Sequence, residues 1–150
     1  METEEVHMRT QMEEAQRLML KTNIKEVLGG DTTLSPILQC QELTYLQRGH
    51  CYRAYCHDSR LASDKFCFSA ALNRKVQEVL VDKHSVIKVT KFKLYNIQFV
   101  FVQQFEFLFE FSKEVMISNT NLLNEKDYEK ILQKKKMLNF LLHLEKLTRN

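Results

Sequence analysis

The side chains best suited to chemistry are four cysteines, two of which have a histidine as a neighbour. All four lie between positions 40 and 67 of the 150-residue chain: Cys40, Cys51, Cys56 and Cys67. Thiolates and imidazoles bind zinc, and Cys-x-x-Cys pairs are typical of zinc sites. This chain has no such pair. The candidates His50-Cys51 and Cys56-His57 place their thiols five residues apart, so that on one strand they would point to opposite faces. We therefore expect ordinary thiols and no metal site.

Catalytic patterns are equally sparse. A nucleophilic enzyme needs a base beside a reactive Cys or Ser side chain. The five histidines are scattered, and no nucleophile elbow or papain-like context surrounds a Cys or Ser residue. With three glycines in all, the chain has no glycine-rich phosphate loop. We expect a protein that is not an enzyme and that uses no cofactor.

The composition predicts one ordinary folded domain. Hydrophobic residues make up 44% of the chain, including 10 Phe and 5 Tyr, which is enough for a packed core. A net charge of +3 does not indicate a strong binder of polyanions. The segment Met1–Glu5 is acidic where a signal peptide is basic, and polar residues break the run Phe99–Phe111 too often for a membrane span. We expect free thiols in a reducing compartment, the cytosol or the nucleus.

The elements that would carry these residues begin with a helical region. From residue 2 to about residue 28, apolar residues recur at intervals of three and four. Asn23 and Glu26 suit the start of a separate short helix, which Gly29-Gly30 ends.

The middle of the chain has the pattern of strands. The candidate strands cover residues 37–43, 52–56, 64–68, 86–94 and 98–111. Residues 70–80 favour a helix, His57–Ser59 is a turn signal, and Tyr95-Asn96 is the expected hairpin turn. Five strands with a helix after the third are what a small Greek-key barrel needs, and closure removes exposed strand edges. The predicted fold is mainly β, a five-stranded OB-fold barrel with an N-terminal helix and a C-terminal amphipathic helix.

The C-terminal helix is expected within residues 121–150, with Asn124 and Asp127 suited to its start. Its apolar stripe consists of Tyr128, Ile131, Leu132, Leu138, Leu141 and Leu142. We interpret the run Lys134-Lys135-Lys136 as a solvated helical face in preference to a nuclear-import or DNA-binding run.

The start of the barrel region carries a motif. Gly30-Asp31-Thr32 is followed after three residues by Pro36-Ile37-Leu38-Gln39, and Tyr52-Arg53 precedes Asp58. Further matching segments are Phe66, Ala70, Leu72-Asn73, Val86–Phe92 and Phe99–Leu108. Over about residues 24–108, the chain thereby resembles the N-terminal OB-fold domain of the large subunit of replication protein A. The chain then divides into an N-terminal helical extension (1–23), an OB-fold domain (24–112) and a C-terminal helical extension (113–150).

The resemblance implies a nuclear recruitment module of DNA replication and repair. In that family the barrel binds acidic amphipathic helices of partner proteins in a basic, partly apolar groove, and binds single-stranded DNA weakly. The mechanism is helix-in-groove recognition steered by charge. The positions of this chain that match the groove are Arg53, Tyr55, Lys65, Cys67, Phe99 and Phe101. Thr44 and Cys51 stand where the family usually has arginines, and Lys91 and Lys93 are the candidates to compensate.

Two interpretations of the aromatic and basic strand residues stay open. The phenylalanines at odd positions from 99 to 111 would share one strand face, and we expect most of them in the barrel core rather than stacked on bases. Phe99 and Phe101 are the two expected to reach the groove. Arg53 has the alternative of a plain solvent-facing strand residue.

The flanking helices support a second function. A flexible linker follows the barrel in the large-subunit family, whereas here an amphipathic helix is expected. That arrangement is more similar to the smaller subunits of replication protein A, which assemble through such helices. The alternative is therefore a structural subunit that forms a complex or oligomer through residues 124–147.

Overall fold

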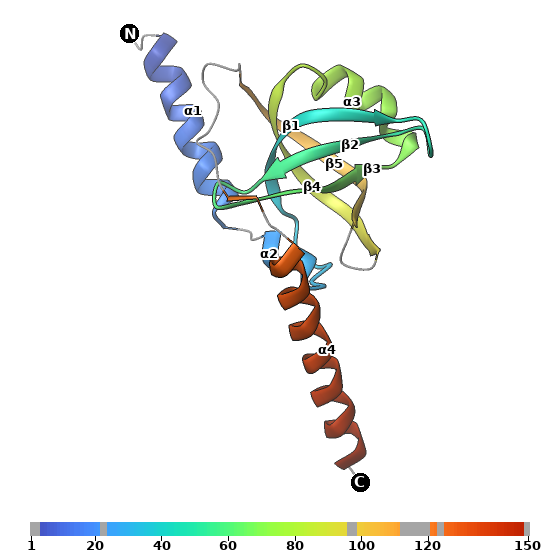
Figure 1. The fold of residues 1–150 in the computed structure, drawn as a ribbon. Coiled ribbons are helices and arrows are strands. Elements are labelled where there is room, and N and C mark those ends of the chain that lie inside the picture. Colours follow the sequence, from blue (N-terminus) through green and yellow to red (C-terminus); the bar gives the residue numbers. More distant parts are fainter. Residues whose placement is uncertain (1–3, 22–23, 96–98, 112–120, 123–124, 149–150) are drawn as a thin grey trace.

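The computed structural model describes residues 4–21, 24–95, 99–111, 121–122 and 125–148. Within them the chain forms a closed five-stranded mixed β-barrel with flanking helices (Figure 1). The barrel strands are β1 (Ile37–Leu46), β2 (Cys51–His57), β3 (Leu61–Phe68), β4 (His84–Tyr95) and β5 (Phe99–Phe111). The helices are α1 (Glu4–Met19), α2 (Ile24–Leu28), the 3₁₀ turn η1 (Ala70–Leu72), α3 (Asn73–Val79) and α4 (Glu125–Thr148). The predicted OB-fold-like barrel with flanking helices is confirmed.

Strand pairing closes the barrel. The order along the sheet is β2-β1-β4-β5-β3, and β2 also pairs with β3, so that the two ends of the sheet meet. Among the barrel strands the pairs are antiparallel except for β3 with β5, where residues 66–68 run parallel to residues 100–102. β1 pairs with both β4 and β2, and a register shift between Gln41 and Thr44 lets it do so, with Glu42 at a φ of 46°. A two-residue strand, β6 (Asn121–Leu122), lies beside β3 and was not predicted.

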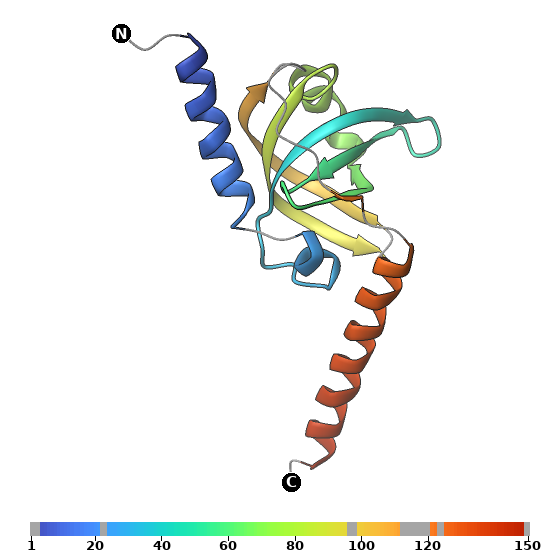
Figure 2. The same cartoon turned by 60° about the vertical axis from the view of Figure 1, so that its left-hand side comes forward.

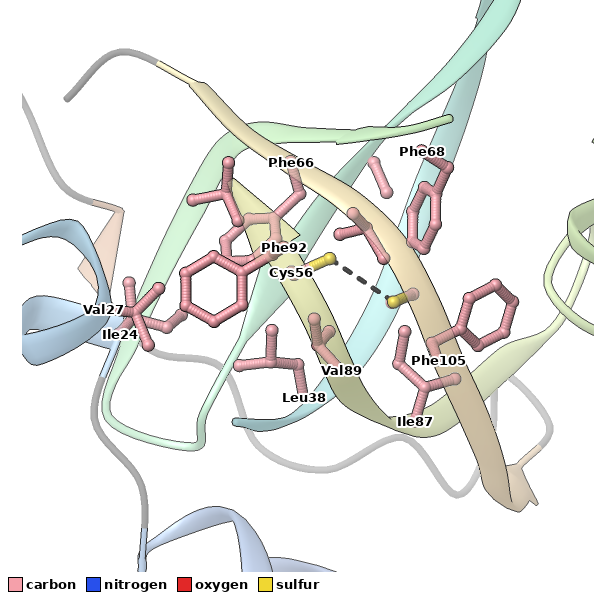
Figure 3. Packing of buried hydrophobic residues seen from close by; sticks show 14 of the residues in the cluster. Ile24, Val27, Leu38, Cys56, Phe66, Phe68, Ile87, Val89, Phe92 and Phe105 are labelled. Carbon is pink, nitrogen blue, oxygen red and sulfur yellow. Dashed lines mark hydrogen bonds between the residues drawn. The ribbon is translucent and has the colours of Figure 1, made fainter. Parts of the chain in front are cut away.

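Apolar side chains from all five strands fill the interior (Figure 3). The largest fully buried ones on the strands are Leu38, Phe66, Phe68 and Ile87. Helices cover the two ends of the barrel, with α2 and α3 at opposite ends (Figures 1 and 2). α2 contributes Ile24, Val27 and Leu28, whereas α3 contributes Val76. Helices of five and seven residues therefore suffice to seal the two openings, because their buried side chains are apolar.

Two of the four cysteines meet inside this core. Cys40 on β1 and Cys56 on β2 are directly opposed in the ladder, and their Sγ atoms are 3.3 Å apart (Figure 3). Both thiols are free and fully buried. Burial, reinforced by the hydrogen bond between the two thiols, raises the pKa of the Cys56 thiol well above its usual value. The Cys56 thiol is therefore a packing group rather than a nucleophile.

The prediction that most odd-numbered phenylalanines of β5 form the core is wrong. Phe105 and Phe111 are buried, but Phe99 and Phe107 are 38% and 42% exposed. The inward positions at the start of β5 are instead Val100 and Val102. The cause is irregular pairing with β4, whose register shifts on both sides of Lys91, opposite residues 102–105. A shift of one residue exchanges the two faces of a strand.

The expected helices are present, with small differences at their ends. Residues 70–80 form η1 followed by α3, with the last residue of the range outside the helix. α1 packs its Ala15 and Met19 against Val86 of β4 and Phe111 of β5. The expected cap residues Asn23 and Asn124 and the Asn96 turn lie outside the described residues. No helix in the described ranges has the length and apolar character of a membrane span.

A buried polar cluster lies beside the β2–β3 turn. The backbone N–H of Ser59 donates to Nδ1 of His57, which leaves the ring proton on Nε2, and Nε2 donates to Oε1 of Gln39 at 2.8 Å. His57 and Gln39 are both fully buried. Burial lowers the pKa of His57 from 6.5 to about 4, with the nearby Asp58 acting in the opposite direction. The fold thus holds this histidine neutral.

We expect the chain to lose stability in mild acid through His57. Its pKa is lower in the folded than in the unfolded state, so the unfolded state takes up the proton first as the pH falls from 6.5 towards 4. The shift corresponds to a loss of about 2 kcal/mol between pH 7 and pH 5. Urea unfolding of the wild type and of His57→Gln at both pH values checks this. The His57→Gln variant should lack the loss of unfolding free energy that His57 causes. Equal pH dependence of stability in the two proteins would contradict the role of His57.

Candidate interaction surfaces

The predicted groove residues lie mainly on the outer face of the barrel. Direct pairing sets Arg53 of β2 opposite Cys67 of β3, Cys67 opposite Phe101 of β5, and Phe101 opposite Lys93 of β4. Directly paired residues on neighbouring strands project to the same side of a sheet. These four side chains therefore form one continuous row across four strands. Thr44 of β1, paired with Arg53, extends the row.

A second group of side chains flanks this row. The ammonium group of Lys65 lies 5.9 Å from the ring centroid of Phe99, and Tyr95 packs edge-on against Phe101 at 5.9 Å. Tyr55 is two residues from Arg53 on β2 and lines the same cavity. Lys91 is exposed but lies at the register shift of β4, opposite Gln104, and outside the row. The structure thus brings together seven of the eight predicted residues and leaves Lys91 at their margin.

The cavity at Arg53 is not basic. It has a volume of about 440 Å³ and is lined by Arg53 together with the carboxylates of Glu42 and Asp64. Arg53 donates from Nε to the Asp64 carbonyl oxygen at 2.7 Å, and its Nη2 lies 3.1 Å from the Asp64 carboxylate. Lys65 is 3.8 Å from the same carboxylate. Burial first, and then Glu42 and Asp64, raise the pKa of Tyr55, as expected where negative charge gathers.

The Cys and acidic side chains of this face do not form a metal site within the described residues. No group of three or more His, Cys, Asp or Glu side chains within the described ranges is placed to hold a metal ion. Cys67 is mostly buried, and burial raises the pKa of its thiol, with Cys51 adding to the effect and Arg53 opposing it. The outer face therefore offers apolar contact and scattered charge, which suits binding.

A second surface is the distal part of α4. The helix is anchored at its start, where Ile131 is buried and the Tyr128 and Ser63 hydroxyls lie 2.6 Å apart. From residue 137 onwards every described side chain is exposed, and the helix extends away from the barrel (Figures 1 and 2). Seven of these are large and hydrophobic, between 40% and 66% exposed: Met137, Leu138, Phe140, Leu141, Leu142, Leu144 and Leu147. We call these seven side chains the α4 apolar face.

The width of the α4 apolar face was missed by the sequence prediction. At about 100° per residue, the seven positions cover roughly 220° of the helix circumference. Of these seven positions, only Leu138, Leu141 and Leu142 were assigned to the apolar stripe of the helix. The sequence carries this signal, because Asn139, His143 and Lys146 lie on the narrow remaining side, although Glu145 and Thr148 lie within the apolar arc. A helix that is apolar on most sides is normally buried.

We expect Arg53→Glu to destabilise the fold by about 1–2 kcal/mol, because it removes the donors to Asp64 and opposes two carboxylates at a partly exposed site. Lys93→Glu changes an exposed lysine of the same row that forms no ion pair within the described residues, so its effect should stay within about 0.5 kcal/mol. Urea unfolding followed by circular dichroism compares the two. Adding Asp64→Arg to Arg53→Glu should restore part of the lost stability. Equal losses of stability in Arg53→Glu and Lys93→Glu would refute the importance of the Arg53–Asp64 pair.

The fold and these two surfaces are the basis for assigning a function. No protein-family model matches the chain, and a search of curated proteins finds no similar sequence. The assignment therefore depends on the chemistry of the surfaces and on the motif at Gly30-Asp31-Thr32.

Proposed function

We propose that this chain is a non-enzymatic subunit of replication protein A type, which assembles with partner proteins through the α4 apolar face. The observation that carries the proposal is the exposure of seven large hydrophobic side chains on one helix segment. A contiguous apolar patch of this kind on a folded protein marks an interaction site. Fully burying one Leu or Phe side chain stabilises by roughly 1.5–3 kcal/mol, so their combined burial is a large driving force.

The breadth of the face bears on the kind of assembly. A two-stranded coiled coil buries a narrow seam of two positions in every seven. The α4 apolar face is much wider, and a single neighbouring helix would leave part of it in water. We therefore infer that α4 packs between at least two helices, as in a helical bundle. This supports the likeness to the smaller subunits of replication protein A, which assemble through helices after an OB-fold.

The likeness to that protein also gives the proposed setting, DNA replication and repair in the nucleus. In the structure, the Gly30-Asp31-Thr32 motif forms the turn between α2 and β1, where the Thr33 N–H donates to the Asp31 carboxylate. Gly30 has a φ of 109°, a value that L-residues rarely adopt. The motif thus forms a defined turn ahead of the first barrel strand. We take this turn as part of the resemblance on which the proposal rests.

Recruitment of acidic helices on the outer face is a second candidate. It is favoured by the alignment of Lys65, Phe99, Phe101 and Lys93 on neighbouring strands. It ranks below assembly because Asp64 already neutralises Arg53, and because Glu42 adds negative charge to the cavity. A negatively charged partner would meet both carboxylates there.

Two double variants separate the candidates. Leu141→Glu with Leu144→Glu introduces charge into the α4 apolar face, whereas Lys65→Glu with Lys93→Glu reverses charge on the outer face. Sedimentation velocity and mass spectrometry of the tagged chain, purified from nuclear extract, give the size and content of its complexes. We expect the α4 variant to lose its stoichiometric partners and the outer-face variant to keep them. The reverse result would favour recruitment, and a monomeric wild type would refute assembly.

We expect single-stranded DNA to bind weakly, and added salt to weaken the binding further. The net charge of only +3 gives little overall attraction to phosphates, and Arg53 on the outer face is already paired with Asp64. Fluorescence anisotropy with a labelled oligothymidine should give a dissociation constant in the micromolar range or weaker at physiological salt, roughly as for non-specific binding. Nanomolar affinity that persists at high salt would show that the barrel grips DNA itself.

A further inference from the structure

A pocket with an excess of lysines lies where α4 leaves the barrel. It has a volume of about 480 Å³ and is formed between α2, the turn that follows it, and the first half of α4. Its charged lining consists of Lys25, Lys130, Lys134 and Lys135, against the carboxylates of Glu26 and Asp31. The lining therefore has two more ammonium groups than carboxylates.

Three of these lysines are not paired with either carboxylate of the lining. Among the described residues, Lys130, Lys134 and Lys135 form no ion pair. Lys135 lies against Gly30, because a Cβ built on this glycine would be 3.4 Å from the Cε atom of Lys135, which is ordinary contact distance. Three unpaired cations on one pocket, whose four lysines outnumber its two carboxylates, repel each other, and an anion in the pocket would relieve that repulsion.

The pocket is a fixed part of the fold. Ile131, on its wall, is 6% exposed and belongs to the barrel core. One turn earlier, the hydroxyl of Tyr128 contacts that of Ser63 on β3. The lysines on this part of α4 therefore stand on an anchored turn of helix, before the helix extends away from the barrel (Figure 2).

Leu138 joins the pocket to the α4 apolar face, because it lines the first and belongs to the second. A protein segment that covers the α4 apolar face reaches the lysines at one end. The lysine run that the sequence suggested to be a solvated face is thus divided. Lys134 and Lys135 line the pocket, whereas Lys136 does not.

The charges of α4 disfavour a second copy of this chain as the molecule that covers the α4 apolar face. Residues 125–136 of α4 contain five Lys and three acidic residues, so two parallel copies would bring their lysines together. Residues 137–148 contain one Lys and one Glu, so an antiparallel copy offers no excess of carboxylates. Like charges in register disfavour self-association and select a partner of opposite charge.

We propose that the pocket is an anion site for carboxylates of an acidic segment on the partner that covers the α4 apolar face. This inference rests on the proposed assembly through α4 and names the chemistry of the partner: a helix with an apolar side and a run of Asp or Glu at one end. The apolar side supplies the contact area, and the carboxylates set the position of the partner along α4.

Labelled synthetic helices test this on the full chain. One peptide has a leucine face long enough to cover residues 138–147, about three turns, and ends in glutamates. The matched peptide has glutamines at the same positions. In fluorescence anisotropy at low salt, we expect the glutamate peptide to bind about tenfold more tightly. Lys134→Glu with Lys135→Glu should abolish that preference, whereas Lys136→Glu, adjacent but outside the pocket, should keep it. Unchanged melting temperatures show that the variants are folded.

The outcomes separate the two proposals. Equal binding of both peptides by the wild type would overturn the anion site while leaving assembly through α4 in place. A preference lost equally in Lys136→Glu would overturn the pocket as its location. Oligothymidine binding that depends on Lys134 and Lys135, without a peptide preference, would assign the pocket to nucleic-acid phosphates and refute the proposal. Failure of both peptides to bind would count against the α4 apolar face itself and the pocket with it.

Discussion

The interaction on which the architecture depends is the buried carboxylate of Asp58. It lies in the β2–β3 turn, is fully inaccessible to solvent, and accepts three backbone N–H groups. Two come from its own turn, Arg60 at 2.9 Å and Leu61 at 2.8 Å, and the third is Ile24 at 3.0 Å, at the start of α2. A buried charge is tolerable only when its hydrogen bonds are made. Asp58 therefore shapes the hairpin that helps to close the barrel and fastens to it the short helix that seals one end.

The position of α4 follows from that connection. α2 is only five residues long and gains its stability from packing, with Ile24, Val27 and Leu28 buried in the barrel end. The turn after α2 places Gly30 beside Lys135 of α4. On the other side, the Ser63 hydroxyl of β3 forms a hydrogen bond with the Tyr128 hydroxyl of α4. The first half of α4 is held between these two elements. Its second half has no neighbour among the described residues, so the fold presents an apolar helix at a defined place and direction.

The sequence predicted the elements well because their signals are local. Apolar and polar residues alternate along residues 37–43 and 86–94, and apolar residues recur every three or four positions in the terminal regions. Both patterns depend on neighbouring residues alone. The errors concern relations between distant residues. The exposure of Phe107, which was expected in the core, depends on how β5 pairs with β4, and the neutralisation of Arg53 depends on Asp64 from the next strand. Likewise, no periodicity relates Asp58 to Ile24, 34 residues earlier. Registers and caps of this kind are settled by packing.

Magnitudes explain why the helix, more than the sheet face, is suited to hold a partner. Exposed ion pairs such as those around Asp64 contribute about 0–1 kcal/mol each, and a partner must displace or accommodate them. Each side chain of the α4 apolar face, already about half exposed, can contribute roughly 1 kcal/mol when it is covered. Seven such contributions exceed what the charges of the sheet face supply, even after the cost of ordering a partner. The lysines of the pocket then act chiefly on the choice of partner. Charge complementarity between two proteins governs their specificity and their rate of encounter more than their total affinity. On α4, apolar area thus supplies affinity and charge supplies specificity. The α4 apolar face and the lysine pocket meet at Leu138.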